Sequence, residues 1–426
     1  MTETFHNPII EEGADPFVTA WQGNYYYVYS VGDARIEVSR ADNIHHLTRA
    51  GKCVFRPEPD MPYSKQLWAP EIHEIDGDWY LYVAADDGDP VNHRMYVLRS
   101  RDKTPDGEYE MIGVLRAEPD CLAIDGTVLH HDGKLYFVWS GWDEGASVWI
   151  PHNQSIFIAE MKSPTEIGSR RVLLSKPDYD WEKHGAVKDK NGKIAPMVNE
   201  GPQILYKDST IHIVYSASHS MTRYYCLGLL TFRGGDILDP AAWVKSDHPV
   251  FSESEGTHGT GHCSFVKAVD GKTDFIIYHA MRTPDGGWRS RGFRAQPFTW
   301  DGDMPVFGKA ATPEDAIETR FARPAHVVRG GSPTLRDRML GSEMGAAAVE
   351  ALLEGKSNIV LCEQKGEITT MDIGKALILD RMYKDKLKDG DLQKFDAETV
   401  AWMREFCAEK FAAFKKMYDL SIEISK

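Results

Sequence analysis

The sequence lacks the features that assign many proteins to a class directly. None of its six cysteines stands in a CxxC pair, which argues against a zinc site and a dense disulfide framework. No stretch approaches the roughly 18 apolar residues of a membrane helix, and residues 1–7 have neither the basic start nor the apolar run of a secretory signal. We therefore expect reduced thiols in a cytoplasmic protein without a membrane partner, with secretion left open.

Basic charge is also scarce. The chain has 49 lysines and arginines against 64 aspartates and glutamates, which leaves a net charge of -15. An acidic chain does not suit a polyanionic partner, so no nucleic-acid binding is expected. The acidic residues are spread along the sequence, which indicates a solvated surface rather than an acidic tail.

What the sequence does contain is a repeat. Five aromatic and aliphatic segments, each opened by a turn residue, have the composition of β-strands and begin 54 to 75 residues apart. This period is that of a four-stranded blade, so we expect an all-β, five-bladed propeller over residues 1–312. The five segments are residues 23–30, 77–85, 133–140, 208–216 and 271–279.

A polar, ionisable residue precedes each of these segments by six to nine positions. These residues are Asp15, Glu71, Asp125, Glu200 and His262. Because the first strand of each blade lines the central channel, we expect them to recur at one place in the blade and to converge on the axis. Carboxylates held close together cannot all ionise freely, so their pKa values separate into those of an acid and a base. One Asp-Pro or Asp-Gly pair is more often a turn, and the prediction depends on five occurring in phase.

The composition changes near residue 313. Residues 341–354 and 396–418 have the apolar spacing of helices, and a short strand is expected between them at 358–362. We therefore predict a linker at 313–325 and a smaller, mostly α-helical domain at 326–426.

Residues 5–310 closely resemble glycoside hydrolase family 43, through the motifs GADPF at Asp15, IDGTV at Asp125 and NEGPQ at Glu200. Members of this family are five-bladed propellers that cleave arabinose- and xylose-containing polysaccharides. The resemblance implies that Asp15 is the general base, Glu200 the general acid and Asp125 the residue that tunes the pKa of the acid. It also implies inverting hydrolysis, in which carboxyl groups about 6.5 to 9.5 Å apart leave room for the attacking water.

Further contacts are implied by the same resemblance. His262, in GHCSF, would face a calcium ion held mostly by water, since calcium prefers oxygen ligands. Trp68 and Glu71, in LWAPEI, look more like the α-L-arabinofuranosidases than the β-xylosidases of the family. With Arg294, in RGFRAQPF, they are the implied substrate contacts, although a single tryptophan is more often core and a single arginine more often a surface ion pair.

We therefore expect an exo-acting α-L-arabinofuranosidase that releases arabinose from arabino-oligosaccharides or from side chains of arabinan or arabinoxylan. β-Xylosidase and endo-arabinanase remain alternatives, because loop shapes at the channel mouth set the linkage preference. A non-catalytic sugar-binding propeller is a further alternative, against which the three intact carboxylates argue.

The C-terminal segment resembles a second family. Residues 326–426 are similar to the end of 6-phosphofructokinase, through RGGSP at Arg329 followed by Asp337 and Arg338. The sequence upstream contains no phosphate-binding glycine loop and no catalytic-aspartate segment of that kinase, so phosphoryl transfer is not expected. A helical cap that forms a homo-oligomer through its apolar faces, or that stabilises the chain, is the functional hypothesis, and a passive gene-fusion remnant is the alternative.

Overall fold

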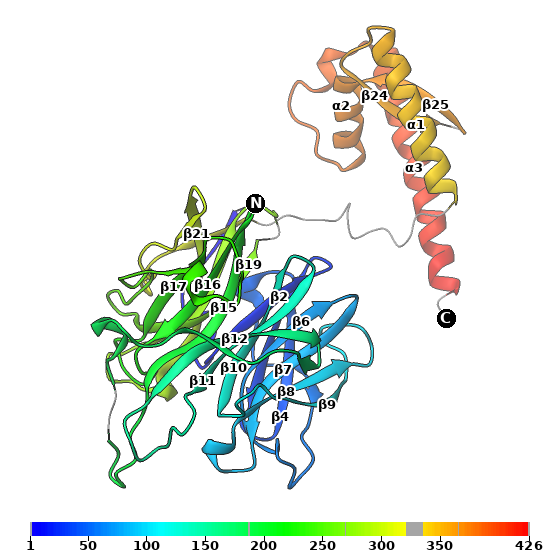
Figure 1. Cartoon of the computed structure of the whole chain (residues 1–426). Helices are drawn as coiled ribbons and strands as arrows, with labels where there is room; N and C mark the ends of the chain where they lie inside the picture. Colours follow the sequence, from blue (N-terminus) through cyan, green and yellow to red (C-terminus); the bar gives the residue numbers. More distant parts are fainter. Residues whose placement is uncertain (1, 186–187, 269, 321–334, 365, 425–426) are drawn as a thin grey trace. The chain divides into compact units, whose positions relative to one another are not determined.

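The computed structural model describes residues 2–424 except 186–187, 269, 321–334 and 365, and the chain divides into two compact units, Met1–Pro324 and Ala325–Lys426. The described part of the first unit is built from strands and short 3-10 turns, whereas the α-helices that the structure describes all belong to the second unit (Figure 1). None of those helices is both long and apolar enough to span a membrane.

Four-stranded antiparallel sheets recur along the first unit. The first sheet contains β2 (Phe17–Trp21), β3 (Asn24–Val31), β4 (Arg35–Ala41) and β5 (Lys52–Phe55). The second contains β6 (Lys65–Ile75), β7 (Asp78–Asp86), β8 (Arg94–Ser100) and β9 (Tyr109–Leu115). The last contains β19 (His258–Lys267), β20 (Asp274–Met281), β21 (Arg291–Asp301) and β22 (Met304–Val306).

The middle of the unit is one larger, nine-stranded sheet. Its first half contains β10 (Ala123–His131), β11 (Lys134–Trp142) and β12 (Asn153–Ser163), with β13 (Glu166–Ile167) and β14 (Val172–Ser175) both paired to β12. Its second half contains β15 (Met197–Lys207), β16 (Thr210–Ala217), β17 (Cys226–Phe232) and β18 (Trp243–Lys245). A short parallel contact between β12 and β15 joins the halves.

The beginning and the end of the first unit are paired with each other. β1 (Thr2–Phe5) forms an antiparallel ladder with β23 (Ile317–Arg320). Residues 317–320 were predicted as part of a linker, and the first unit therefore extends beyond residue 312. The pairing partner lies more than 310 residues away in the sequence, so local composition could not reveal this strand.

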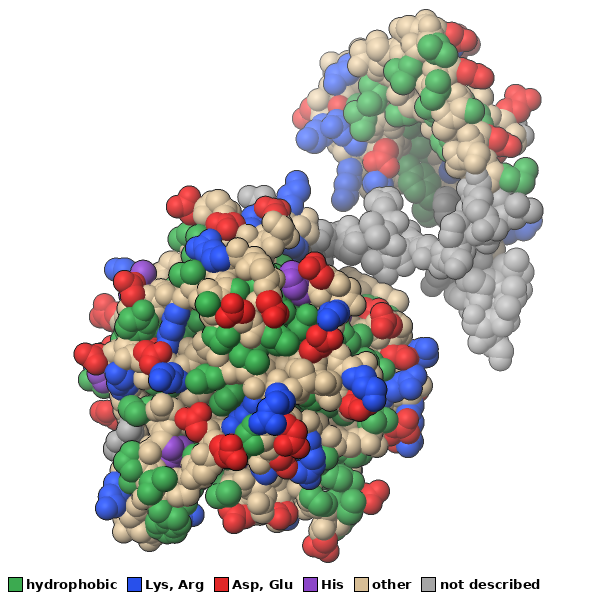
Figure 2. All heavy atoms as spheres, viewed as in Figure 1, with side chains coloured by type: hydrophobic (Ala, Val, Ile, Leu, Met, Phe, Trp, Pro, Cys, Tyr) green, Lys and Arg blue, Asp and Glu red, His purple; other side chains and the backbone are tan. Residues whose placement is uncertain are grey.

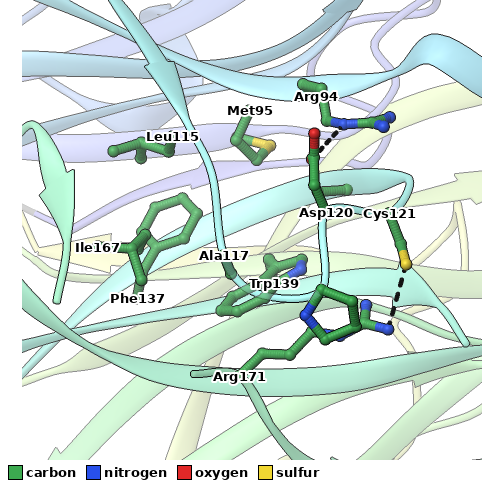
Figure 3. Close-up of a pocket in the computed structure, with 12 residues that line it drawn as sticks. Arg94, Met95, Leu115, Ala117, Asp120, Cys121, Phe137, Trp139, Ile167 and Arg171 are labelled. Carbon is green, nitrogen blue, oxygen red and sulfur yellow. Dashed lines mark hydrogen bonds and ion pairs between the residues drawn. The ribbon is translucent and has the colours of Figure 1, made fainter. Parts of the chain in front are cut away.

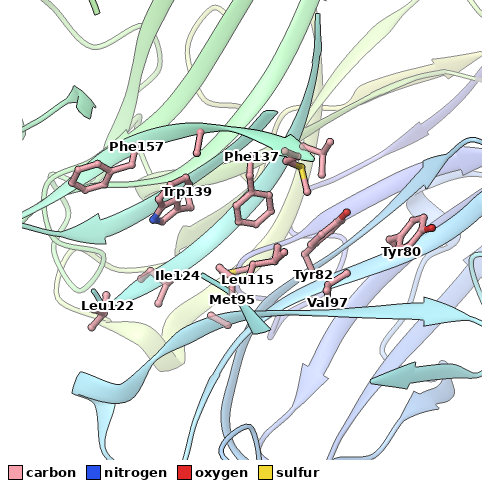
Figure 4. Close-up of a cluster of buried hydrophobic side chains, with 14 of the residues drawn as sticks. Tyr80, Tyr82, Met95, Val97, Leu115, Leu122, Ile124, Phe137, Trp139 and Phe157 are labelled. Carbon is pink, nitrogen blue, oxygen red and sulfur yellow. The ribbon is translucent and has the colours of Figure 1, made fainter. Parts of the chain in front are cut away.

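Strand β7 shows why the predicted segments read as continuous apolar runs. Leu81 and Val83 pack into the cluster shared with the first sheet, whereas Tyr82 and Ala84 pack into the cluster shared with β11. Figure 4 shows the second of these clusters, with Tyr82 facing Phe137. Both faces of the strand are buried, so polar residues do not alternate with apolar ones.

Strands β6, β10, β15 and β19 each carry a bulge that changes the direction of their side chains. On β10 the register with β11 shifts between Ile124 and Thr127, and the unpaired Asp125 has a φ of 53°. On β15 the shift lies between Glu200 and Gln203. A bulge of this kind leaves residues unpaired and re-aims them at the end of the strand.

One left-handed backbone position recurs five times, at the bulges of β6, β10, β15 and β19 and two residues before β2, whose ladder with β3 shows no register shift. It is occupied by Asp15 (φ 49°), Ala69 (41°), Asp125 (53°), Gly201 (54°) and His262 (45°). The sequence predicted that five ionisable residues occupy one place in the blade, and this was wrong for two of them. Glu200 precedes the left-handed position by one residue and Glu71 follows it by two, because the bulge makes neighbouring residues point in different directions.

The surface of the first unit carries both charges. Figure 2 shows acidic and basic side chains interspersed over its visible face, without one dominant acidic patch there. This distribution fits the spread of acidic residues along the sequence.

The second unit has a small core of its own. It contains α1 (Leu335–Leu353), the hairpin β24 (Ile359–Gln364) with β25 (Glu367–Asp372), α2 (Ile373–Tyr383) and α3 (Ala397–Ile424). Ile378 and Leu379 of α2 pack against Met403 of α3. The kinase-like RGGSP motif and the side chains of Phe414 and Met417, two members of the predicted apolar stripe, lie outside the described residues.

Candidate active site

A pocket of about 320 Å³ opens where the bulged strands of the first unit meet. Its lining includes Asp15, Asp125, Glu200 and His262, which come from four different sheets or half-sheets. Residues separated by more than 200 positions are therefore brought together, as the sequence predicted for these four.

Asp15 stands beside a group of nitrogen atoms, and we call this the base side of the pocket. Its Oδ1 atom lies 3.0 Å from Arg291 Nη1 and 3.3 Å from both His262 Nδ1 and His279 Nδ1. Burial alone would raise the pKa of Asp15, but the neighbouring Arg291 guanidinium outweighs burial and holds that pKa well below its usual range. Asp15 is therefore ionised at neutral pH.

His279 also fixes the backbone at this point. The Asp15 backbone N–H donates to His279 Nδ1 at 3.1 Å. Burial lowers the pKa of His279 to about 4, so its ring is neutral. The neutral ring holds the left-handed turn at Asp15 without adding a charge.

Glu200 has different neighbours, and we call its surroundings the acid side. Gln154 Nε2 donates to Glu200 Oε2 at 2.7 Å, and the Tyr225 hydroxyl donates to Oε1 at 2.9 Å. Burial and the charge of Asp15 raise the pKa of Glu200 to about 7, although Tyr225, Arg291 and Gln154 oppose the shift. Near neutral pH this carboxyl group is poised to hold and release a proton.

Asp125 belongs to the acid side as well. It is 5% exposed, and its Oδ2 atom accepts a hydrogen bond from the Gly201 backbone N–H at 3.1 Å. Burial, followed by the charges of Glu200 and Asp15, raises the pKa of Asp125 well above its usual value. Because Asp125 and Glu200 repel each other when both are ionised, the pair retains a proton near neutral pH.

One stacked pair of rings connects the two sides. Tyr225, which donates to Glu200, lies parallel to His279, with ring centroids 5.5 Å apart. Both side chains are fully buried. The positions of the base and the acid are therefore set by the same packed layer.

His262 lies at the inner wall of the pocket. Its backbone N–H donates to Ser216 Oγ at 2.8 Å, and burial lowers the pKa of its ring. Among the residues that the structure describes, no group of three or more histidine, cysteine or acidic side chains is arranged to hold a metal ion. These side chains thus do not supply a calcium shell by themselves, and water would have to provide most of the ligands.

Trp68 lines the pocket, and its ring packs on a buried histidine. It is 40% exposed and stacks on His93 with centroids 4.0 Å apart. His93 is fully buried and lies 3.0 Å from Asp86. Trp142 and Trp288, which the sequence did not single out, add two further aromatic walls.

Two residues implied as substrate contacts do not line the pocket. Glu71 is 3% exposed, accepts a hydrogen bond from Gln203 and lies 2.8 Å from His73. Arg294 is fully buried and donates to Thr257. The arginine in the pocket is Arg291, and the two side chains point to opposite faces of β21 because strand side chains alternate.

The site residues that were not predicted differ in whether the sequence contained a signal for them. Arg291 belongs to the same RGFR motif as Arg294, so counting along the predicted strand could have separated them. Gln154 and Tyr225 show no signal of this kind. They reach Glu200 only through the pairing of β12 with β15 and of β16 with β17.

A second pocket in the first unit does not share this chemistry (Figure 3). It has a volume of only about 10 Å³ and lies between the second sheet and β11, where Arg94 pairs with Asp120 at 2.6 Å and Arg171 Nη2 lies 3.4 Å from Cys121 Sγ. A space of this size holds at most a water molecule.

Comparisons with known proteins point to the same region. A family model for glycosyl hydrolases family 43 matches residues 5–305. The extracellular exo-alpha-(1->5)-L-arabinofuranosidase of Streptomyces chartreusis is 34% identical over 286 residues, which are 65% of this chain and 83% of that protein. The chain spans 63% of the length of three other α-L-arabinofuranosidases that it matches.

A solved structure and a second group of relatives complete the comparison. The crystal structure of the alpha-L-arabinofuranosidase from Lactobacillus brevis is 34% identical, covers 73% of this chain and 98% of its own, and has a TM-score of 0.66. A C-terminal segment of 73 residues is 48% identical to the ATP-dependent 6-phosphofructokinase of Clostridium botulinum. This match covers 17% of the chain and only 23% of the kinase.

Proposed function

The chain belongs to glycosyl hydrolase family 43 and is a glycoside hydrolase, and we propose that it is an exo-acting α-L-arabinofuranosidase. Its substrates would be arabino-oligosaccharides or the arabinose side chains of arabinan and arabinoxylan. The observation that carries the reaction is the opposite displacement of two pKa values in one pocket. Asp15 is held ionised, whereas the pKa of Glu200 is raised to about 7.

In the proposed reaction Asp15 is the general base and Glu200 the general acid. A water molecule attacks the anomeric carbon and gives its proton to Asp15 as the bond to the leaving oxygen breaks. Glu200 donates its proton to that oxygen. The two carboxyl groups then exchange protons with solvent, and the sugar leaves with inverted configuration.

The other residues of the pocket would support these two. Arg291 keeps Asp15 ionised and oriented, and Tyr225 with Gln154 fixes the carboxyl group of Glu200. Asp125 would hold a sugar hydroxyl and, through its repulsion of Glu200, keep a proton on the acid side. Trp68 would form one wall for the sugar ring.

We also infer that the first unit is a five-bladed propeller. The support is the sequence of sheets: β2–β5, β6–β9, β10–β12 with β14, β15–β18 and β19–β22 would each be one blade. The β1 and β23 ladder would join the ends of the unit.

Calcium near His262 remains a proposal. The ion would sit on water ligands, and it would stabilise the neighbouring carboxylates electrostatically. No step of the proposed reaction depends on it. A chelator should lower the thermal midpoint of the full chain if the ion is present, and calcium should restore it, whereas unchanged unfolding would contradict the proposal.

The role of the C-terminal fragment over 326–426 is likewise proposed. Leu352 and Leu353 of α1 are 73% and 83% exposed, and Figure 2 shows further hydrophobic side chains on the visible face of this unit. We propose that such surface is covered in a homo-oligomer. Light scattering should report a multimer that Leu352→Glu with Leu353→Glu converts to a monomer. The predicted cytoplasmic location stays a prediction, and none of the six cysteines, all of which the structure describes, forms a disulfide, as a reducing compartment would keep them.

The activity is tested with nitrophenyl α-L-arabinofuranoside and nitrophenyl β-xyloside. We expect the unsubstituted chain to prefer the arabinofuranoside and to release single arabinose units from arabino-oligosaccharides. Preference for the xyloside would change the substrate and keep the reaction. Absence of hydrolysis of both compounds and of longer arabinans by the folded chain would contradict the proposal.

A further inference from the structure

Arg294 is a buried cation that the pocket does not use. Its side chain is fully buried, and it does not line the pocket of Asp15 and Glu200. Nη1 donates to Thr257 Oγ1 at 3.2 Å. Nε and Nη2 are buried, and neither has a hydrogen-bond partner among the residues that the structure describes.

The two nitrogens without partners lie on the same edge of the guanidinium group. In arginine the N–H bonds of Nε and Nη2 run parallel and form a two-pronged fork, while Nη1 lies on the other side. This fork is the geometry with which arginine binds an anion through two hydrogen bonds. The occupied nitrogen, Nη1, is thus the one that does not belong to the open fork.

The charge of Arg294 also lacks a counterion. Thr257 is neutral, and its hydroxyl donates in turn to the Ala311 carbonyl oxygen. No carboxylate of the described residues forms an ion pair with Arg294, and Glu11, which acts on it at longer range, is bonded to Arg282. Arginine does not lose its proton in proteins, and a buried charge without a partner is strongly unfavourable.

We propose that the fork of Arg294 binds a small monovalent anion, with chloride as the physiological ligand. The anion supplies the missing charge and accepts both free N–H groups. Complete burial favours an ion that has no bulky substituents and that becomes enclosed as the sheet around β21 forms. The site is separate from the catalytic pocket, so it supports the fold rather than the reaction.

The first test is the thermal unfolding of the full chain in sodium chloride and in sodium gluconate at equal ionic strength. We expect a midpoint about 3 °C higher in chloride, with a dependence on concentration that saturates. Arg294→Met keeps an unbranched apolar side chain and removes the guanidinium charge, so it should lose this difference. Arg99→Met is the control, because Arg99 is 45% exposed and pairs with Asp78, and it should keep the difference. Equal midpoints for the unsubstituted chain would overturn the proposal.

A second measurement does not depend on whether the variant folds. Crystals of the unsubstituted chain grown in bromide should show an anomalous peak at hydrogen-bond distance from Nε and Nη2 of Arg294. Density for water at that position without a bromide signal would overturn the proposal, and so would retention of the chloride effect by Arg294→Met.

Discussion

Asp15 and Glu200 are carboxylic acids that line one pocket, and burial raises the pKa of both. Their final states nevertheless differ. On the base side the Arg291 cation outweighs burial, whereas the acid side adds a second carboxyl group, Asp125, and two neutral hydrogen-bond donors. The comparison teaches that the sign of the nearest charge, rather than the depth of burial, decides which carboxyl group acts as acid and which as base.

The largest effect on kcat is expected when each of the two carboxyl groups is removed separately. Asp15→Asn and Glu200→Gln should each lower kcat by about 10³-fold, since each loses one proton-transfer group. Asparagine is chosen because it tolerates the left-handed backbone of Asp15 (φ 49°). A substrate with a dinitrophenyl leaving group, which needs no proton, should restore much of the activity of Glu200→Gln.

The same substrate should not restore Asp15→Asn, because the attacking water still lacks a base. Circular dichroism serves as the control for folding. Equal rescue of both variants would show that the assignment of acid and base is wrong.

Arg291→Met should give the next largest effect, a fall of about 100-fold at pH 5 that becomes smaller at pH 7. Arg291 lowers the pKa of Asp15 and opposes the raised pKa of Glu200, so its loss moves both upward. Both limbs of the kcat/KM profile should therefore move to higher pH. Arg291→Lys keeps a cation and should return the limbs toward their original positions, and a profile that stays in place would contradict this role.

Tyr225→Phe should have a smaller effect, a loss of about tenfold in kcat from one charge-assisted hydrogen bond. The Tyr225 hydroxyl lowers the pKa of Glu200, so the alkaline limb should move above its original position near pH 7. The acid limb, which belongs to Asp15, should not move. Movement of both limbs would instead indicate that the variant disturbs the stacked His279.

Replacing either carboxyl group should shift the thermal midpoint by about 3 °C, and the two shifts should have opposite sign. The pKa of Glu200 is raised from 4.5 to about 7, so its contribution is fully present below pH 4.5 and is lost as the pH rises through 7. Glu200→Gln should therefore be the more stable protein at pH 8. The pKa of Asp15 is lowered, so its contribution is present at neutral pH, and Asp15→Asn should be less stable. Two shifts of the same sign would contradict the comparison.

The sequence predicted the parts of the site that depend on short motifs. Asp15, Asp125, Glu200 and His262 were found through turn motifs in a repeat, and the structure brings them into one pocket. The prediction that all five ionisable residues occupy one place in the repeat was wrong for Glu200 and Glu71, because the offset to the following strand does not report the bulge. Local sequence contains no register information, and a bulge is defined only by the strand opposite.

Site residues whose positions are set by the pairing of distant strands could not be predicted from the sequence. Gln154 reaches Glu200 because β12 and β15 run side by side, and Arg294 lies away from the pocket because strand side chains alternate. Two helices of the second unit were expected from their apolar spacing, and α1 and α3 cover the predicted ranges 341–354 and 396–418 except for residues 354 and 396, whereas α2 was not predicted. The exposure of Leu352 and Leu353 depends on what surrounds the fragment, which the sequence of the fragment does not specify.

The recurring left-handed position has a consequence for engineering. Three of its five occurrences hold chemically active side chains, one is Gly201, and one is Ala69, which follows Trp68 of the pocket wall. Ala69 thus has the same left-handed backbone conformation but no catalytic side chain. To change the sugar preference, Ala69 could be replaced by asparagine or aspartate, which tolerate a left-handed backbone. The base and the acid would remain unchanged.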